Sequence, residues 1–206
     1  MIAVGGYAMK LRRRRWLTLL LVMSVFHAAP GYAGEPLELL KATSVRVITL
    51  LKNPKLNAAT RKQERLAKLK AIVTPIFDYD EVARRTLASH WNERSAAERK
   101  EFTSLLRAFL EKIYSDRIAL YDGERLVFTR ENIDQEFAEV ESKIINRKNE
   151  ENLVIYRLKR SNGRWKVYDA VVENISIVNN YRSQFHRVIS KSSFEDLKRM
   201  LRKKAE

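Results

Sequence analysis

Hydrophobic residues along the chain repeat with two different periods. Over the first half they recur every three or four residues, which predicts helices over residues 36–52, 57–77, 78–91 and 96–121. Beyond Asp122 and Gly123 the period changes to two, which predicts strands over residues 126–129, 137–146, 153–160 and 164–172. A helical period returns over residues 177–188 and 192–202. This order predicts an α+β domain: a four-stranded antiparallel meander wrapped by N- and C-terminal helices around an apolar cleft.

Capping residues and one tight turn define some of these boundaries more closely. Asp78 and Ser95 are each followed three residues later by a glutamate, which is the pattern of a capping box at a helix start. Asn162 and Gly163 are the strongest short-range signal for a two-residue hairpin turn. Such a turn fixes the register of its two strands, and the expected pairs are Arg160 with Trp165, Leu158 with Val167, Tyr156 with Asp169 and Val154 with Val171.

Both faces of the predicted sheet carry apolar side chains, which is unusual for an antiparallel sheet with one bare side. Val154 and Leu158 fall on one face, and Leu153 and Ile155 on the other. The helix over residues 96–121 also has apolar residues over a wide arc of its surface. Surfaces of this kind are covered by protein on both sides, or by protein on one side and a ligand on the other.

The first thirty-three residues have the three parts of a secretory signal. Lys10 and residues 12–15 form a basic cluster, residues 16–26 are nearly all apolar, and small residues occupy positions 31 and 33. The apolar run is shorter than the roughly 20 residues that span a bilayer. We therefore expect a signal peptide over residues 1–33, cleavage after Ala33 and one mature domain over residues 34–206. Met1 and Met9 both remain possible starts.

The 206-residue chain is strongly basic, with 40 Lys and Arg, 25 Asp and Glu and a formal net charge of +15. Removal of the signal peptide takes away five basic residues and no acidic one, which leaves a net charge of +10. The basic residues of the predicted helices alternate with acidic ones, as on a solvated face. We therefore expect anionic lipid headgroups or acidic protein surfaces as partners, and not nucleic acid.

No arrangement of residues typical of catalysis stands out in the chain. The absence of cysteine excludes disulfides, thiolate metal sites, cysteine nucleophiles and acylation of a cysteine. His90 and His186 have no HxxxH or HxH spacing and are interpreted as structural or surface residues, so we expect no metal. Asp169 is the one candidate for a buried catalytic carboxylate, although a hydrogen bond with the Tyr156 hydroxyl is the favoured explanation.

Several segments together follow the pattern of one protein family. They are residues 77–87, 90–91, 95–102, 114–123, 165–169 and 172–185. These segments span nearly the whole mature chain and resemble the MlaC/toluene-tolerance family of periplasmic phospholipid carriers. Ser89 and Asn174 stand at positions where the family usually has glycine. Because asparagine tolerates positive φ better than most residues, Asn174 is expected to keep the same bend.

The resemblance implies a soluble periplasmic protein, not an enzyme, that shuttles a phospholipid and so maintains outer-membrane lipid asymmetry. The implied partners are an inner-membrane ABC transporter with a lipid-binding ring subunit and an outer-membrane lipoprotein complex. The phospholipid is cargo, no cofactor is implied, and we expect a monomer. Three alternatives stay open: a carrier of another membrane lipid such as a hopanoid-like molecule, an exported enzyme that uses Asp169, and a basic envelope-binding protein without an internal cavity.

We expect the lipid in a cleft between the sheet, the long helix and the C-terminal helix. The predicted lining residues are Phe109, Ile113, Tyr114, Val154, Tyr156, Leu158, Val167, Val171, Ile175, Tyr181 and Phe185. Replacing Ile175 with arginine is expected to abolish co-purified lipid while the protein still folds.

Overall fold

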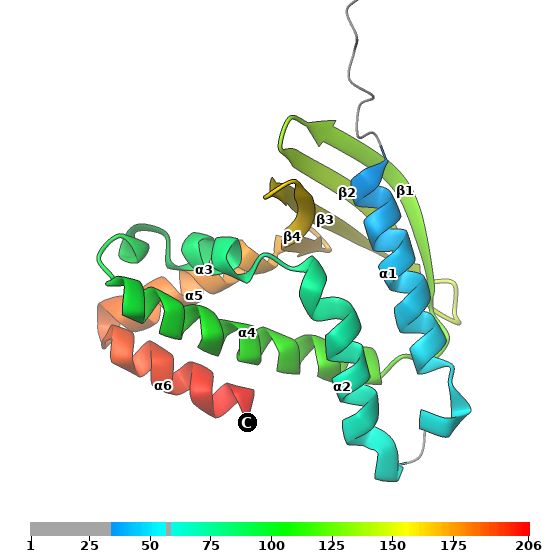
Figure 1. Ribbon diagram of the computed structural model, residues 1–206, viewed down its shortest axis with the longest axis horizontal. Coiled ribbons are helices and arrows are strands. Elements are labelled where there is room, and N and C mark those ends of the chain that lie inside the picture. The colour runs from blue at the N-terminus through cyan, green and yellow to red at the C-terminus, as the bar shows by residue number, and fades with distance from the viewer. Residues whose placement is uncertain (1–33, 57–58) are drawn as a thin grey trace, which may run out of the picture. The chain divides into compact units, whose positions relative to one another are not determined.

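The computed structural model describes residues 34–56 and 59–206, so the predicted signal peptide and its cleavage site lie outside the described residues. The elements follow the predicted order of helices, strands and helices again (Figure 1). The α-helices are α1 (Glu35–Leu51), α2 (Lys62–Val73), α3 (Tyr79–Leu87), α4 (Ala96–Ala119), α5 (Ile177–Lys191) and α6 (Phe194–Ala205). The strands are β1 (Arg125–Asp134), β2 (Phe137–Ile145), β3 (Glu151–Ser161), β4 (Arg164–Val172) and β5 (Ile175–Ser176). Short 3-10 turns are η1 (Pro54–Leu56), η2 (Ala59–Arg61), η3 (Thr74–Ile76) and η4 (Ala88–Trp91).

The strands form one antiparallel sheet in the order β1-β2-β3-β4-β5. This confirms the predicted α+β fold with its four-stranded meander and adds a two-residue fifth strand at the edge. β1 is longer than the predicted strand over residues 126–129. A bulge between Phe128 and Arg130 interrupts the alternation of apolar and polar residues there, and the pairing with β2 continues beyond it.

The hairpin between β3 and β4 has the predicted turn. Asn162 and Gly163 have φ values of 50° and 74°, as a two-residue primed turn requires. The next two predicted pairs are also confirmed: Arg160 with Trp165 and Leu158 with Val167.

Beyond Leu158 the register differs from the prediction. The register shifts between Arg157 and Leu158, because Tyr168 is an extra residue in β4. The predicted pairs of Tyr156 with Asp169 and of Val154 with Val171 are therefore wrong, and the actual pairs are Tyr156 with Ala170, Arg157 with Asp169, Val154 with Val172 and Ile155 with Val171. Since a shift of one residue moves a side chain to the other face, Val171 lies on the face opposite to Tyr156.

Both predicted helix caps are present, in different forms. Ser95 and Glu98 form a complete capping box at the start of α4. The side chain of Asp78 accepts a hydrogen bond from the main-chain nitrogen of Glu81 at the start of α3. The carboxylate of Glu81 does not reach back to the cap, because it is held by Arg84 and Arg85.

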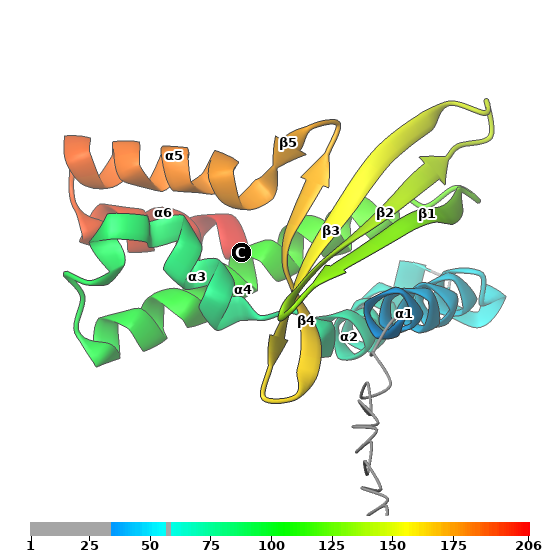
Figure 2. The same ribbon diagram turned by 90° about the horizontal axis from the view of Figure 1, so that it is seen from above.

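The two faces of the sheet are covered by different helices. Figure 2 shows α1 and α5 on opposite sides of the sheet. We call the face that carries Val140, Tyr156 and Leu158 the α1 face, because Leu40 of α1 packs with these strands. The other face, which carries Asp169, is the α5 face, because the first turn of α5 is bound to that carboxylate.

Buried side chains form two separate cores. The helical core packs α3, α4, α5 and α6 together and consists of Val82, Ala83, Leu87, Phe102, Leu106, Phe109, Val178, Phe185, Phe194, Leu197 and Leu201. The sheet core joins α1 to the α1 face and consists of Leu40, Ala138, Val140, Leu158, Trp165 and Val167. Among the described residues, no buried side chain belongs to both cores.

Candidate functional site

The α1 face of the sheet is the candidate site, because its apolar surface extends beyond the buried sheet core. A ring of half-buried apolar side chains surrounds that core, and it comes from α1, the segment before α3 and strands β1 and β3. The ring consists of Leu37, Leu39, Ile76, Phe77, Phe128, Ile133 and Tyr156. Half-buried apolar side chains still expose apolar area to water, and covering that area with an apolar ligand gains about 25 cal/mol per Å².

Of this ring, only Tyr156 is among the lining residues predicted from the sequence. Leu37 belongs to the helical period of the first predicted helix, and that pattern alone does not show which strand face the helix covers. Phe128 and Ile133 are separated by the bulge in β1, which hides their common orientation from a strict two-residue period.

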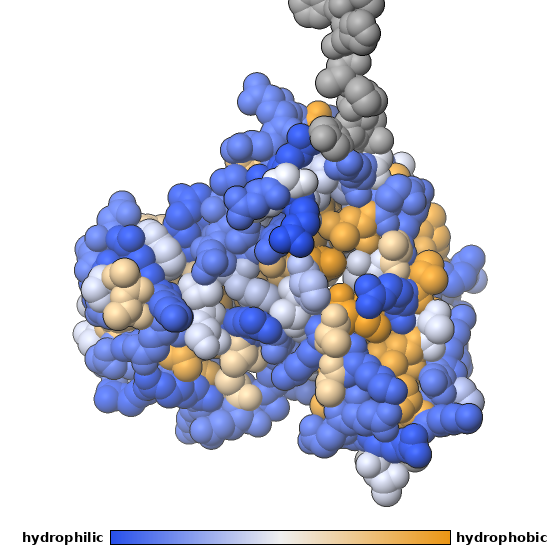
Figure 3. All heavy atoms as spheres, in the orientation of Figure 1, coloured by the Kyte–Doolittle hydropathy of each residue, from blue (hydrophilic) through white to orange (hydrophobic). Residues whose placement is uncertain are grey.

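Apolar side chains also reach the surface on the side of α1 and α2. Figure 3 shows apolar side chains gathered over these two helices, on a surface that is otherwise mostly hydrophilic. Val45 of α1 is 63% exposed, and Val172 at the end of β4 is 39% exposed. The sheet core is therefore bordered by accessible apolar surface.

Four of the predicted lining residues share the α1 face. Tyr156, Leu158 and Val167 belong to the sheet core or pack against it, and Val154 is buried beside Ser142 of β2. Burial raises the pKa of the Tyr156 hydroxyl, and its hydrogen bond with Ser142 lowers it by less. Val171 is buried but lies on the α5 face, because of the bulge at Tyr168.

A second group of predicted lining residues lies in the helical core. Phe109, Tyr181 and Phe185 contact one another, with ring centroids 5.3 Å and 5.5 Å apart. Phe185 is fully buried and also meets Phe102 edge to face. Ile113 packs against the same core. The structure therefore groups these residues with one another and not with those of the α1 face.

The two remaining predicted residues lie elsewhere. Ile175 is 62% exposed on β5, and the loss of lipid expected for Ile175→Arg stays a prediction. Asn174 just before it has a φ of 64°, so it does adopt the bend expected there. Tyr114 stacks on Phe77, with ring centroids 6.3 Å apart, and thus approaches the ring around the sheet core.

The hydroxyl end of Tyr114 enters a buried polar cluster that the sequence does not reveal. Thr74 donates a hydrogen bond to Glu111 Oε1 at 2.8 Å, and its hydroxyl lies 3.2 Å from Tyr114 Oη. Arg107 Nε also donates to Glu111 Oε1, at 2.9 Å. Burial alone would raise the pKa of Glu111, but the hydrogen bonds from Arg107 and Thr74 hold it below its ordinary value. The cluster therefore fixes a charged carboxylate between α2, η3 and α4.

Asp169 has a structural role that accounts for its burial. Its carboxylate accepts hydrogen bonds from the Ser176 hydroxyl at 2.6 Å and from the main-chain nitrogen of Val178 at 3.0 Å. Arg157 Nη1 lies 3.4 Å away. The expected bond with the Tyr156 hydroxyl is absent because of the changed register. Asp169 therefore anchors the start of α5 to the sheet.

The two histidines of the described chain meet across the helical layer. His90 Nε2 and His186 Nδ1 are 3.0 Å apart, and His90 Nδ1 lies 3.2 Å from Glu93 Oε2. Across the described ranges, no cluster of three or more His, Asp or Glu side chains is arranged to hold a metal ion. The same ranges contain no helix with the length and apolar character needed to cross a membrane.

The carboxylate of Glu81 is buried between two arginines. Burial by itself would raise the pKa of Glu81, but hydrogen bonds from Arg84 at 2.7 Å and Arg85 at 2.8 Å hold it below its ordinary value near 4.5. A pKa that is depressed by folding contributes stability above the unfolded-state pKa, and this contribution is lost as the pH falls through the folded-state pKa.

We therefore expect the free energy of unfolding to fall as the pH drops below about 4.5. Urea titrations at a series of pH values measure this slope. Glu81→Gln removes the titrating group and should flatten the slope while costing about 1–3 kcal/mol at neutral pH. An unchanged slope in the variant would assign the acid sensitivity to other carboxylates.

Comparison with known proteins identifies a family and solved structures of similar fold. The sequence model of the family described as MlaC protein matches residues 41–203. The phospholipid-binding protein from Ralstonia solanacearum, solved in complex with a phospholipid, is similar in fold, with a TM-score of 0.71 and 20% sequence identity. The match covers 82% of this chain and 95% of that chain. No curated protein matches the chain significantly.

Proposed function

The chain belongs to the MlaC family, and from this premise we propose that it carries a phospholipid through the periplasm and exchanges this lipid with complexes of the inner and outer membranes. Members of this family are periplasmic, non-enzymatic phospholipid carriers that serve the lipid asymmetry of the outer membrane. Asp169 supports the non-enzymatic role, because its carboxylate is already bound by the start of α5. The similar fold of a protein solved with a bound phospholipid supports the same proposal.

The single observation in the structure that carries the proposal is the ring of half-buried apolar side chains around the sheet core. Each CH₂ removed from water gains about 0.8 kcal/mol, so two acyl chains of roughly thirty methylenes would cost on the order of 24 kcal/mol if exposed. A soluble carrier must therefore cover nearly the whole length of both chains. Transfer between a bilayer and such a site is close to isoenergetic, so the partners set its direction.

We place the acyl chains against the α1 face of the sheet, between the sheet and the helices. The predicted residues Val154, Tyr156, Leu158 and Val167 form the floor of this proposed site. Tyr114 lies at the border of this site because its ring stacks on Phe77, and the exposed Ile175 lies at the sheet edge. The helical-core residues Phe109, Ile113, Tyr181 and Phe185, and Val171 of the α5 face, lie apart from this floor, and their contact with lipid stays a prediction.

The route and the partners belong to the same proposal. Residues 1–33 serve as a cleaved signal peptide, which delivers residues 34–206 to the periplasm. The partners are an inner-membrane ABC transporter with a lipid-binding ring and an outer-membrane lipoprotein complex, and the protein meets them as a monomer. The basic surface of the mature chain, with its net charge of +10, suits acidic protein surfaces and anionic membranes.

Mass spectrometry of organic extracts tests the proposed function. The mature chain, purified from the periplasm without detergent, should yield phospholipid in about one-to-one proportion. Removal of the lipid should lower the midpoint of thermal unfolding, because a ligand that binds only the folded state stabilises it. An extract with a different lipid class would identify another cargo, and an extract without lipid would remove the carrier function.

A further inference from the structure

A hollow in the surface of the molecule lies apart from the sheet core and has a different chemistry. It is a cleft of about 640 Å³ between the η3–α3 segment and α4, and Trp91 of η4 and Lys166 of β4 also line it. This volume is within the range of small-molecule sites, about 300–1,000 Å³. Its lining also includes Thr103 and Ser104 of α4 and Phe77.

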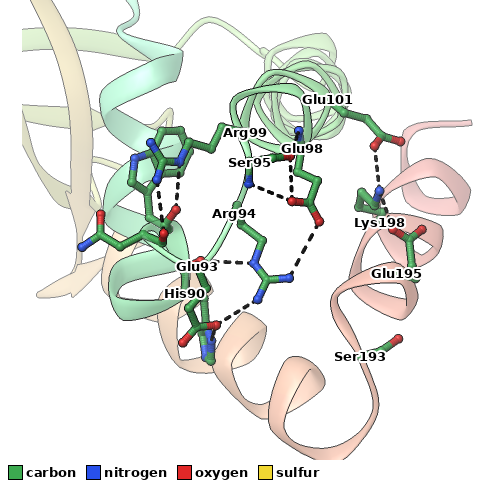
Figure 4. Close-up of polar contacts among 12 residues, drawn as sticks. His90, Glu93, Arg94, Ser95, Glu98, Arg99, Glu101, Ser193, Glu195 and Lys198 are labelled. Atoms are coloured by element: carbon green, nitrogen blue, oxygen red, sulfur yellow. Dashed lines mark hydrogen bonds and ion pairs between the residues drawn. The ribbon is translucent and has the colours of Figure 1, made fainter.

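Positive charge in this cleft exceeds negative charge and is only partly neutralised. Lys100 and Lys166 line the cleft and form no ion pair with any residue in the described ranges. Arg99 lines it too, and its Nε donates to the main-chain oxygen of Trp91 at 2.9 Å (Figure 4). Since a carbonyl group has no net charge, this hydrogen bond does not neutralise the guanidinium. Arg107 alone is paired, with Glu111.

Two carboxylates also line the cleft, and one of them already accepts hydrogen bonds from other parts of the protein. Asp78 caps α3 and accepts a hydrogen bond from Ser161 at 2.7 Å. Asp80 is exposed on the first turn of α3. The cleft is therefore left with cations that have no carboxylate partner, which is the composition of an anion site.

Thr103 adds a hydroxyl without a partner. Its Oγ1 atom is buried and forms no hydrogen bond with any described residue, although a threonine in a helix commonly bonds the carbonyl one turn earlier. A buried polar atom without a partner is costly unless a ligand or water completes it. Together with Lys100 and Lys166, Thr103 offers the charged and neutral donors that phosphate oxygens prefer.

One aromatic residue, Phe77, connects this cleft to the proposed lipid site. Phe77 lines the cleft and also packs against the sheet core. Its main chain runs beside β4, where it forms a bridge with Val167, a residue of the α1 face. A lipid with its acyl chains on the α1 face could therefore place its polar end in the cleft by passing Phe77.

We propose that the cleft between α3 and α4 binds the phosphate of the carried phospholipid, with Lys100 and Lys166 as its charged contacts and Thr103 as a hydroxyl donor. This inference rests on the proposed function and assigns the headgroup end of the same ligand. It makes the cargo an anionic phospholipid, because two unpaired lysines favour a net negative headgroup over a zwitterionic one.

The test uses the mature protein after removal of its lipid. Binding of dihexanoylphosphatidylglycerol is measured by calorimetry at low salt for the wild type and for the variant Lys100→Ala/Lys166→Ala. The variant should bind about tenfold to a hundredfold more weakly, since it loses two charge-assisted contacts. The control is Lys62→Ala/Lys148→Ala, which removes two exposed lysines outside the cleft, makes the same change in net charge and should leave the affinity unchanged.

Two further measurements separate the outcomes. Inorganic phosphate should compete with the lipid for the wild type, and Thr103→Val should weaken binding without lowering the unfolding midpoint. Equal affinity of the lysine variant and the control would overturn the headgroup site while leaving the carrier function intact. Phosphate binding that does not compete with the lipid would mean a free-phosphate site and would also overturn the assignment. A wild type that neither binds the lipid nor yields phospholipid in its extract removes the proposed function itself.

Discussion

Co-purified phospholipid is expected to fall at least about tenfold when Phe128 is replaced with glutamate. Phe128 is half-buried on β1, pairs with Ser142 on the α1 face and packs against the sheet core. A glutamate at this position would place a carboxylate against the acyl chains, and burying a charge without a partner costs several kcal/mol. Because each 1.4 kcal/mol corresponds to about tenfold in affinity, the loss is large. Mass spectrometry of matched extracts measures it.

Val127→Glu is the matched control for this change. Val127 precedes Phe128 on the same strand, points to the other face and is 41% exposed. The same new charge should there leave the lipid content at the wild-type level. Both variants should keep the wild-type circular dichroism spectrum, since β1 is an edge strand and, without lipid against it, the half-buried position 128 stays in contact with water. Full lipid content in Phe128→Glu would exclude the α1 face as the acyl-chain site.

The free energy of unfolding is expected to fall by about 3–5 kcal/mol when Phe185 is replaced with alanine. Phe185 is fully buried in the helical core, where it meets Phe102 edge to face and stacks on Tyr181. Its loss removes the ring's transfer energy and leaves a cavity between α4 and α5. Since a domain of this size is stable by about 5–15 kcal/mol, the variant loses a large part of its stability. Urea unfolding followed by circular dichroism gives the value.

Ile175→Ala provides the comparison for Phe185→Ala. Ile175 lies just before α5 and is 62% exposed, so its truncation should change the free energy of unfolding by less than about 0.5 kcal/mol. An effect of Phe185→Ala near that of Ile175→Ala would mean that the helical core repacks around the missing ring. Such repacking would be expected of an interior that adapts to a lipid.

Local patterns in the sequence were sufficient for the order and type of the elements. The capping box of Ser95 and Glu98 marks the start of α4, and the Asn162–Gly163 turn places the β3–β4 hairpin. These features depend on residues a few positions apart, where propensity and hydrogen-bonding chemistry act directly. The fold class followed from the order of periods alone.

The register beyond Leu158 could not be read in the same way. The bulge at Tyr168 inserts one residue without a glycine or proline to mark it. Tyr168 is held by its tertiary surroundings, with Arg85 4.2 Å above its ring and Phe137 edge to face beside it. A prediction from strict alternation does not include this extra residue, so it assigns Asp169 and Val171 to the wrong faces of the sheet.

Long-range contacts account for the other parts of the site that the sequence did not show. His90 and His186 are 96 positions apart in the chain, and Thr74 is 37 positions from Glu111. Neither pair has a spacing that predicts contact. The cleft that holds Lys100 and Lys166 likewise combines α4 with β4, so its charge appears only once the sheet is placed beside the helices.

The division of the interior into two cores has a mechanical consequence. Since no buried side chain in the described ranges is shared between them, a ligand that spreads the sheet core against α1 need not disturb the packing of α3 to α6. The two cores stay joined through β4, because Asp169 holds the start of α5 and Tyr168 packs against the helical core. Tails of different length and unsaturation would then be accommodated on the sheet side alone, while the helical bundle serves as a fixed scaffold.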